Sequence, residues 1–381
     1  MTDEQLHAHL IDQQGSRASL NTPVLVVDLD ALTRNIDKMA AHAASHKLKL
    51  RPHSKTHKSP DIARRQIEAG AVGVCCAKIG EAEAMAENGV TTGLHITSPV
   101  VSPPAIERLV ALNAKTTDLM CAVDSAQNVH AIGVAAAKGD KPLKLIIDLD
   151  PGMHRTGVTS PQAAVVVLEA IRAHPSLSYA GLQCYCGGEQ HIETFAARRE
   201  TMQAKAELIR AVIDALTAAG GAPAIVTGGG TGTHRIDPAL GVYTELQVGS
   251  YVFMDSQYLA CELTEDGSGS PFETSLMVDA RVVSANTPGM VTIDAGFKAF
   301  ATDADRPVVL TGAPDGSKYV FMGDEHGALF LPKGEALALS HIVTLAAPHC
   351  DPTVNLYDTY HLVQGDTLRA LWPVAARGRS R

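Results

Sequence analysis

Lys55 is the residue of this sequence whose type and surroundings suggest chemistry most directly. It lies in the run Arg51-Pro-His-Ser-Lys-Thr-His-Lys58, which begins where an apolar stretch ends. A lysine that loses its hydration has a lowered ammonium pKa and can form a Schiff base with an aldehyde. The alternative is an exposed lysine in a basic loop, and the run by itself favours that alternative.

Two glycine-rich turns are suited to binding a phosphate through backbone N–H groups. Thr227-Gly-Gly-Gly-Thr-Gly-Thr233 follows one apolar run, and Gly249-Ser250 follows the next. Glycines let the backbone approach an anion closely, and such turns recur at phosphate sites. One turn is a weak signal, but two turns together with Lys55 predict a site for a phosphate-bearing aldehyde.

His349 and Asp351 form a candidate pair of metal ligands. They are two residues apart, so on an extended segment both side chains would point to the same side and could share a cation. A nitrogen with a hard carboxylate oxygen suits manganese, magnesium or cobalt as well as zinc. Such a pair is usually structural, and it gains weight here from the motif around it, Pro348-His-Cys-Asp-Pro-Thr-Val-Asn355.

Eight apolar, β-rich runs would position these groups. The predicted strands are Leu48–Pro52, Val72–Ala77, Gly93–Thr97, Asp118–Asp124, Leu143–Asp150, Tyr179–Cys186, Ala224–Gly228 and Glu245–Phe253. Helical spacing of apolar residues predicts helices among them, including Ala31–His46, Pro60–Gly70, Ile79–Gly89, Gln162–His174 and Glu193–Ala219. The alternation favours a closed (β/α)8 TIM-type barrel over an open doubly wound sheet. Barrels carry catalytic groups at the C-terminal ends of their strands, so Lys55 and both glycine turns are expected at one face.

The pattern changes after Phe253, where strands follow one another without helices. The predicted strands are Glu273–Ser284, Met290–Asp294, Tyr319–Met322, Ala328–Leu331, Ala338–Ala346 and Thr367–Val374. We therefore expect a barrel domain over residues 20–265 and a mostly antiparallel β domain over residues 266–381, which carries His349 and Asp351. A further predicted strand, Val24–Asp28, means that residues 1–28 could complete the β domain.

Composition excludes several classes of function. The net charge is −9, from 32 Lys and Arg against 41 Asp and Glu, and aromatic residues are 4% of the chain, so nucleic acid is not an expected partner. The sequence has no signal-peptide pattern and no apolar run long enough to span a membrane. Seven cysteines without metal-binding spacing favour a reducing compartment. The expected location is the cytoplasm.

Several long motifs resemble those of D-threonine aldolases and D-serine dehydratases, members of the alanine-racemase-type (fold-type III) class of pyridoxal-phosphate enzymes. The similarity runs from about Thr22 to Gly378. The motifs are Thr22-Pro23 with Asp28, the Arg51–Lys58 run, Gly152-Met-His-Arg-Thr-Gly157, Gly228-Gly-Gly-Thr-Gly232 and Pro348-His-Cys-Asp-Pro-Thr-Val-Asn355.

The resemblance implies a role for each site residue. Lys55 would bind pyridoxal 5'-phosphate covalently, and the phosphate would be held by Thr231, Gly249 and Ser250, with Tyr258 near it. Arg155 would neighbour the cofactor phenolate or the substrate carboxylate, unless it is a surface residue paired with Asp150. Tyr185 and His191 are candidates for the environment of the ring and substrate, although Tyr185 could equally be a packing residue of the barrel. A homodimer is also implied.

The sequence departs from its relatives at two positions near the expected cofactor. Racemases place an arginine against the pyridine nitrogen where this chain has Gln247, and aldolases often have glutamine where this chain has Ala77. A neutral amide changes how strongly the ring withdraws electrons. The contact made by the missing glutamine would have to be supplied elsewhere.

The resemblance implies a metal-dependent aldolase for D-threonine or similar D-3-hydroxy amino acids. The His-x-Asp pair, as opposed to the His-x-Cys of the dehydratases, would bind Mn²⁺ first, with Mg²⁺, Co²⁺ or Zn²⁺ also suited. The cation would lower the pKa of the substrate β-hydroxyl, and a hydroxide on the cation or His191 would take its proton. Collapse would break Cα–Cβ and leave glycine and an aldehyde. The alternatives are a D-serine or D-3-hydroxyaspartate dehydratase and a non-enzymatic pyridoxal-phosphate carrier, whereas Gln247 and the metal pair disfavour a racemase.

Overall fold

Eight short parallel strands form a curled sheet in the computed structural model, which describes residues 1–381. Their order is β2-β9-β8-β7-β6-β5-β4-β3. The strands are β2 (Lys49–Leu50), β3 (Val74–Cys76), β4 (Leu94–Ile96), β5 (Met120–Val123), β6 (Leu143–Asp148), β7 (Leu177–Cys184), β8 (Ile225–Gly228) and β9 (Glu245–Leu246). Seven of the eight predicted barrel strands contain one of them, whereas β7 begins at Leu177, two residues before the predicted strand Tyr179–Cys186.

The residues after β2 close this sheet into a barrel. His53 and Cys75 form a parallel bridge, and the Cys75 N–H donates to the carbonyl of Pro52 at 2.8 Å. The Val72 N–H likewise donates to the carbonyl of Leu50 at 2.8 Å. The predicted fold class is therefore confirmed for the first part of the chain.

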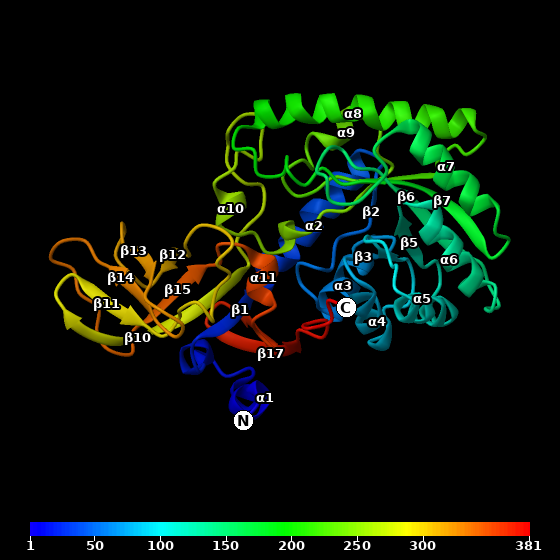
Figure 1. Ribbon diagram of the computed structural model, residues 1–381. Helices are drawn as coiled ribbons and strands as arrows, with labels where there is room; N and C mark the ends of the chain where they lie inside the picture. The colour runs from blue at the N-terminus through cyan, green and yellow to red at the C-terminus, as the bar shows by residue number, and fades with distance from the viewer. The chain divides into compact units, whose positions relative to one another are not determined.

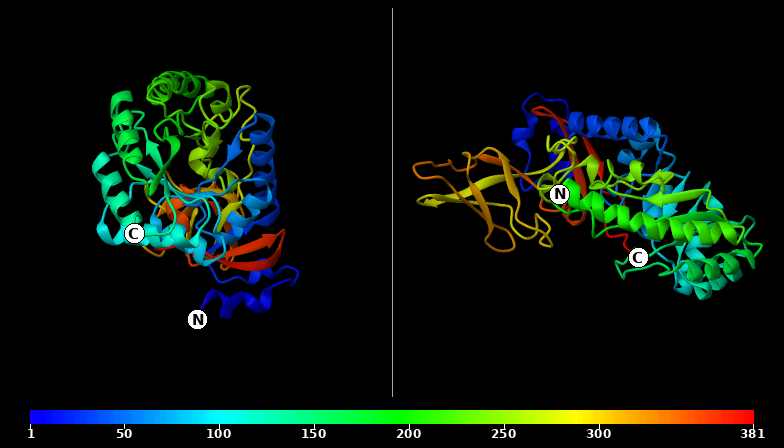
Figure 2. Two further views of the ribbon diagram at one scale, coloured as in Figure 1. Left: turned by 90° about the vertical axis from the view of Figure 1, so that its right-hand side faces the viewer. Right: turned by 90° about the horizontal axis from the view of Figure 1, so that it is seen from above.

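Helices lie outside the barrel strands, as Figures 1 and 2 show. Three of them begin at a Ser-Pro pair, because serine at the N-cap and proline in the first turn both suit a helix start. The helices of this unit are α3 (Pro60–Glu68), α4 (Ile79–Glu87), α5 (Pro103–Lys115), α6 (Ala126–Ala136), α7 (Pro161–Arg172), α8 (Phe195–Ala218) and α9 (Asp237–Leu240), with the second half of α2 (Leu29–Ser45).

The predicted strand Glu245–Phe253 is shorter than expected. The strand itself ends at Leu246, and the chain turns at Gly249 into the 3-10 helix η3 (Ser250–Val252). There the carbonyl of Ser250 accepts from the N–H groups of Phe253 and Met254 at 3.0 and 2.7 Å. The second predicted phosphate turn is therefore a turn that leaves the sheet.

A buried ion pair joins Arg51, the residue after β2, to Glu245 of the neighbouring strand β9. Nε of Arg51 lies 2.7 Å from Oε1 of Glu245, and Nη2 lies 3.0 Å from Oε2. A bidentate pair satisfies both charges, which a buried pair requires. Nearby, burial lowers the pKa of His95 to about 3, so its imidazole is neutral.

The remaining strands form the sheet of a second unit, which consists of residues 1–37, 250–260 and 270–377. The main order is β13-β14-β11-β10-β1-β16-β17, and β15 pairs with both β10 and β12 (Figure 1). The strands are β1 (Val24–Asp28), β10 (Leu276–Thr287), β11 (Met290–Ile293), β12 (Val308–Thr311), β13 (Lys318–Phe321), β14 (Gly327–Phe330), β15 (Ile342–Ala346), β16 (Thr359–Gln364) and β17 (Thr367–Pro373). The other elements are α1 (Asp3–His7), η1 (Ala8–Leu10), η2 (Ser16–Ser19), η3, α10 (Ser256–Leu259) and α11 (Cys350–Val354).

The N-terminal strand β1 lies inside this second sheet. It pairs antiparallel with β10 and parallel with β16. Residues from both ends of the chain form one apolar cluster around it, made of Leu10, Leu20, Val24, Val26, Met277, Val363 and Leu368. The mostly antiparallel β region that the sequence predicts is confirmed.

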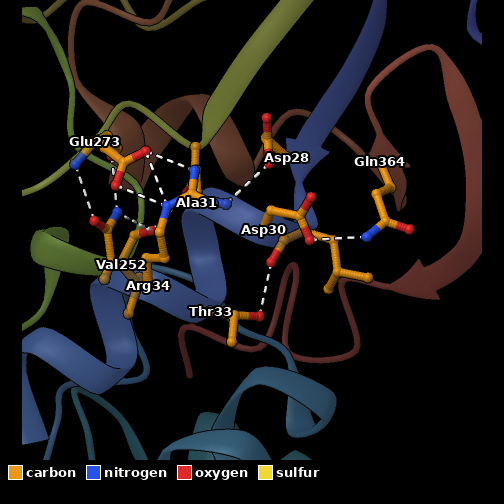
Figure 3. Close-up of polar contacts among 11 residues, drawn as sticks. Asp28, Asp30, Ala31, Thr33, Arg34, Val252, Glu273 and Gln364 are labelled. Atoms are coloured by element: carbon orange, nitrogen blue, oxygen red, sulfur yellow. Dashed lines mark hydrogen bonds and ion pairs between the residues drawn. The ribbon is translucent and has the colours of Figure 1, made fainter.

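Figure 3 shows how α2 starts directly after β1. The carboxylate of Asp28 accepts the Ala31 N–H at 2.9 Å, and Asp30 accepts from Nε2 of Gln364 at 2.9 Å. Arg34 pairs with Glu273 at 2.6 Å. These contacts fix the helix start to the β unit.

No helix of the chain combines the length and apolarity that crossing a bilayer requires.

Candidate functional site

Lys55 lies in the turn that follows β2, at the C-terminal end of that strand, where the sequence analysis expects it. Its N–H donates to Nδ1 of His53 at 3.3 Å, and Nε2 of His53 lies 3.1 Å from the hydroxyl of Thr97. The Lys55 side chain is half-buried. The turn is therefore anchored to the ends of two barrel strands.

Lys58, the second lysine of the run, has a different environment. It is buried and forms an ion pair with Glu81, whose other carboxylate oxygen accepts the Ala77 N–H at 2.7 Å. Ala77, at the position where aldolases often have glutamine, is thus held by Glu81 through its backbone N–H. The ion pair commits Lys58 to a structural role.

The glycine turn after β8 is held by side chains packed beneath it. The Gly230 N–H donates to Thr233 Oγ1 at 3.2 Å, and the Gly232 N–H donates to Gln190 Oε1 at 3.0 Å. A Cβ on Gly230 would lie 2.4 Å from Gln190 Oε1, so a larger residue here would force Gln190 or the turn to shift. Thr231 is buried in the same turn, and its carbonyl lies 2.7 Å from Nδ1 of His234.

Each of the two predicted phosphate turns lies beside a buried hydroxyl that has no hydrogen-bond partner. One is Oγ1 of Thr56, the residue after Lys55, which a Cβ on Gly249 would approach to 2.7 Å. The other is Oγ1 of Thr227, the first residue of the glycine turn. Buried hydroxyls are nearly always hydrogen-bonded. These two therefore fit a cofactor that brings its own oxygen atoms.

A chain of side-chain amides leads from Gln247 into the barrel. Gln183 donates through Nε2 to Asp148 Oδ1 at 2.8 Å, and Gln247 donates through Nε2 to Gln183 Oε1 at 3.3 Å. A carboxylate can only accept, so Asp148 fixes the direction of both amides. Burial raises the pKa of Asp148 to about 6, against hydrogen bonds from Gln183 and Thr156 that lower it.

The structure brings Arg155 and Tyr185 together. The guanidinium carbon of Arg155 lies 5.6 Å from the centre of the Tyr185 ring, within the range of a cation–π contact. Asp150 does not pair with Arg155. Its carboxylate instead accepts the N–H groups of Gly152, Met153 and His154 at 2.7 to 3.1 Å, which shapes the turn.

His191 lies in an exposed turn between β7 and α8. Its neighbour Gln190 is buried and donates through Nε2 to the carbonyl of Cys186 at 2.9 Å. Gln190, which the sequence analysis did not single out, therefore holds this segment in place through a buried hydrogen bond. Its only sequence signal is that it precedes a histidine in a glycine-rich loop.

Ser250 and Tyr258 are buried in the β unit, and Asp255 holds the segment between them. Oδ1 of Asp255 accepts the Tyr258 N–H at 3.1 Å, and Oδ2 accepts the Cys350 N–H at 2.9 Å. Asp255 thus links the Tyr258 helix to the His-x-Asp motif. Nothing in the local sequence marks this residue, because its partner is almost a hundred residues away.

His349 and Asp351 also come together in the β unit. Nε2 of His349 lies 3.9 Å from Oδ2 of Asp351, and Nδ1 lies 2.7 Å from Oδ2 of Asp303. Histidine ligands of metals commonly use the second nitrogen for such a carboxylate contact. The donors fit a divalent cation, and Asp303 is a residue that sequence analysis missed.

The extended segment expected around His349 is wrong. His349 itself is extended, with φ −141° and ψ 121°, but it is the residue before helix α11 and Asp351 lies in the first turn of that helix. Thr353 Oγ1 donates to the carbonyl of His349 at 2.7 Å, which stabilises the helical turn. The two side chains meet across a helix start and not along a strand, while Cys350 between them is fully buried.

Comparison with known proteins matches two families to the chain. The family described as "Alanine racemase, N-terminal domain" matches residues 27–257, and "Putative serine dehydratase domain" matches residues 275–363. The chain is 38% identical to the 3-hydroxy-D-aspartate aldolase of Paracoccus denitrificans (strain Pd 1222), covering 95% of this chain and 93% of that protein. It is 37% identical to the D-threonine aldolase of an Arthrobacter species, covering 96% and 94%. The crystal structure of D-threonine aldolase from Filomicrobium marinum superposes with a TM-score of 0.91 at 35% identity, covering 95% and 97%.

Proposed function

Since the chain belongs to the alanine racemase N-terminal domain family of pyridoxal-phosphate enzymes, we propose that it is an aldolase that cleaves D-3-hydroxy amino acids to glycine and an aldehyde. Its substrate is a small-molecule amino acid. The observation that carries the proposal is the pairing of His349 Nε2 with Asp351 Oδ2, with His349 Nδ1 on Asp303. This donor set suits a cation that acts on a substrate hydroxyl, which is the group an aldolase must deprotonate.

Lys55 would hold pyridoxal 5'-phosphate covalently through Nζ. Thr231, Gly249 and Ser250 would bind the phosphate, and Tyr258 would lie near it. Support comes from the unpartnered buried hydroxyls of Thr56 and Thr227 beside the two turns. When bound, the cofactor supplies the electron sink that stabilises a carbanion at Cα.

Gln247 would face the ring nitrogen in place of the arginine of racemases. Its Nε2 donates one hydrogen to Gln183, which leaves its second N–H and the acceptor Oε1 for a further partner. Through Oε1 it would accept from a protonated ring nitrogen, which withdraws electrons more strongly, whereas through its second N–H it would donate to an unprotonated one.

The remaining site residues would bind the substrate carboxylate, bind the cation and accept the hydroxyl proton. Arg155, held over Tyr185, would bind the substrate carboxylate or the cofactor phenolate. His349 and Asp351 would bind Mn²⁺, which supplies the Lewis acidity that lowers the pKa of the substrate β-hydroxyl. An imidazole nitrogen of His191 would accept the hydroxyl proton and pass it to solvent, which its exposed turn allows. The Cα–Cβ bond would then break as the Cβ–oxygen bond becomes the carbonyl of the released aldehyde, and a proton from solvent added at Cα would give glycine.

A dehydratase of D-serine or D-3-hydroxyaspartate is the second candidate, because residues 275–363 match a family described as a putative serine dehydratase domain. It would release ammonia and an oxo acid. Against it stands Asp351, an oxygen ligand where a thiolate would suit zinc.

We also propose that the chain forms a homodimer, because of its resemblance to the family. Sedimentation velocity would test this proposal.

Product analysis tests the proposed function. The purified chain, saturated with pyridoxal phosphate, is incubated with D-threonine, D-serine and D-3-hydroxyaspartate, with either chelator or added Mn²⁺. We expect glycine and an aldehyde, produced only with the cation. Asp351→Ala should abolish rescue by Mn²⁺, whereas Asp358→Ala, an exposed acidic control, should not. Ammonia and an oxo acid as the products would favour the dehydratase, and inactivity on all three substrates would contradict both enzymes.

A further inference from the structure

Three potential metal ligands, none of which belongs to the His-x-Asp motif, converge at the N-terminal helix of the β unit. They are Asp3 and His7 of α1 and His361 of β16. Asp3 and His7 are four residues apart on the helix, so they share one face. One ligand atom of each residue lies within 4.8 Å of the other two.

The two histidines are buried and in direct contact. Each is 1% exposed, and Nδ1 of His7 lies 2.8 Å from Nε2 of His361. The rings meet edge to face at an interplanar angle of 71°. Asp3 is half-buried at the edge of the pair, where solvent can reach it. Two imidazole nitrogens and one carboxylate oxygen therefore point to a common position.

The second nitrogen of each imidazole has a carbonyl-type partner that would orient a metal ligand. Nε2 of His7 lies 3.2 Å from Oδ1 of Asn21, and Nδ1 of His361 lies 3.3 Å from the carbonyl of Leu25. Metal-bound histidines commonly donate their other N–H to a carboxylate, an amide or a backbone carbonyl. The arrangement leaves His7 Nδ1 and His361 Nε2 as the coordinating atoms.

We propose that Asp3, His7 and His361 bind a divalent transition-metal cation, with Zn²⁺ as the best match to two imidazoles and a carboxylate. This site is independent of the proposed aldolase function and of His349 and Asp351. It is a site of the β unit alone, because all three ligands belong to that unit.

Asn21 lets the pair exist in two hydrogen-bonded forms. Without a cation, the Asn21 N–H donates to Nε2 of His7 at 3.0 Å, and Nδ1–H of His7 donates to Nε2 of His361. With a cation, His7 takes the other tautomer, and its Nε2–H donates to Oδ1 of Asn21. Neither form leaves a buried imidazole nitrogen without a partner, so loading needs only a proton shift and a small opening of the pair.

The opening is modest. Two nitrogens bound tetrahedrally to zinc at about 2.0–2.1 Å lie roughly 3.4 Å apart, compared with the 2.8 Å of the hydrogen-bonded pair. Asp3 would supply the third ligand and water the fourth. Because His7 and His361 are 354 positions apart, the cation would join the two ends of the chain. Binding to the folded state alone would then stabilise the β unit.

The site is tested by measuring the zinc bound to a variant chain that lacks His349 and Asp351. The full chain with bound pyridoxal phosphate carries His349→Ala and Asp351→Ala, is stripped with chelator, and is dialysed against Zn²⁺ before the bound zinc is measured. We expect one Zn²⁺ per chain in this background, and none when Asp3→Asn and His7→Gln are added. The matched control adds Glu4→Gln and His9→Gln, which change the same residue types at exposed neighbouring positions and should retain the ion.

Asp3→Asn alone keeps both buried histidines and guards against misfolding of the double variant. It should weaken Zn²⁺ binding at least ten-fold. When Co²⁺ is titrated in place of Zn²⁺, the d–d absorption should be weaker in this variant than in the background chain. A background chain that binds no Zn²⁺ would overturn the proposal. So would zinc binding that is equal in the Asp3→Asn, His7→Gln chain and the Glu4→Gln, His9→Gln chain.

Discussion

His349 uses its two ring nitrogens for different partners. Nδ1 contacts Oδ2 of Asp303 at 2.7 Å, while Nε2 faces Oδ2 of Asp351 at 3.9 Å. A carboxylate on Nδ1 fixes the tautomer that leaves the lone pair on Nε2 for a cation. Asp303 would therefore orient the ligand without binding the metal itself.

Replacing Asp303 tests this division of roles. Asp303→Ala should weaken Mn²⁺ binding by roughly 10- to 100-fold, because the ring loses its orientation and its negative partner. The measurement is a Mn²⁺ titration followed by electron paramagnetic resonance. Asp305→Ala, which removes an exposed acid two residues away, is the control. Equal affinities in the two variants would show that Asp303 has no part in the site.

The buried carboxyl of Asp237 should make the free energy of unfolding depend on pH. Burial raises the pKa of this carboxyl from its ordinary 3.8 to about 8, although hydrogen bonds from Thr233 and Gly230 favour the charged form. The folded state then binds the proton more tightly than the unfolded state, so the contribution of this carboxyl to stability is fully present below about pH 4 and is lost as the pH rises to about 8. In denaturant unfolding at pH 5 and pH 8, Asp237→Asn should lose less stability than the natural chain. Parallel losses would contradict the raised pKa.

Site residues could be predicted from the sequence where they belong to a contiguous motif. Lys55, Thr231 and His349 lie in such runs, and the structure places Lys55 at the end of a barrel strand. Asp303 and Asp255 could not be predicted, because each acts on a residue tens of positions away and has no motif of its own.

The glycine turn after β8 is tightly fitted to Gln190, which leads to a prediction about cofactor affinity. Gly230→Ala would place a Cβ 2.4 Å from Gln190 Oε1, so the turn or Gln190 must move. We expect at least a ten-fold weaker affinity for pyridoxal phosphate in reconstitution of the cofactor-free protein. Gly188→Ala, where nothing lies within 4 Å of the added carbon, should bind like the natural chain. The turn is not the phosphate site if Gly230→Ala binds equally well.

Helices were predictable from the helical spacing of their apolar residues, and the barrel strands from short continuous apolar runs. Two strands of the β unit were not predicted, for opposite reasons. β12 lies at an edge of its sheet and has no fully buried residue. β16 is buried, but it contains Tyr360 and His361, whose polar atoms hide the apolar pattern in the sequence. Similarly, the spacing of His349 and Asp351 gave no indication of the helix that begins between them.

The whole chain is organised so that its first strand completes a unit made mainly of its last hundred residues. Val26 of β1 is fully buried and lies opposite Met277 on one side and His361 on the other. Residues 1–37 and 270–377 therefore share one core. The resemblance along the full sequence could predict the class of fold, whereas the exact partners of β1 depend on pairings that no local pattern encodes.

Charge introduced into this first strand should destabilise the β unit. Val26→Asp buries an unpaired carboxylate and should cost several kcal/mol of the free energy of unfolding, roughly 3 kcal/mol or more. Val283→Asp, on an exposed position of β10, should change it by no more than about 0.5 kcal/mol. Denaturant unfolding followed by circular dichroism gives both values. Similar stabilities would mean that β1 does not hold the unit together.

The covalent attachment of pyridoxal phosphate is tested most directly by reducing the loaded protein with borohydride, digesting it and locating the modified residue by mass spectrometry. We expect the phosphopyridoxyl group on Lys55, and the same result in Lys58→Arg, because the buried Lys58 is paired with Glu81. A group found on any other side chain, or none on the loaded protein, would contradict the proposed site and with it the aldolase chemistry.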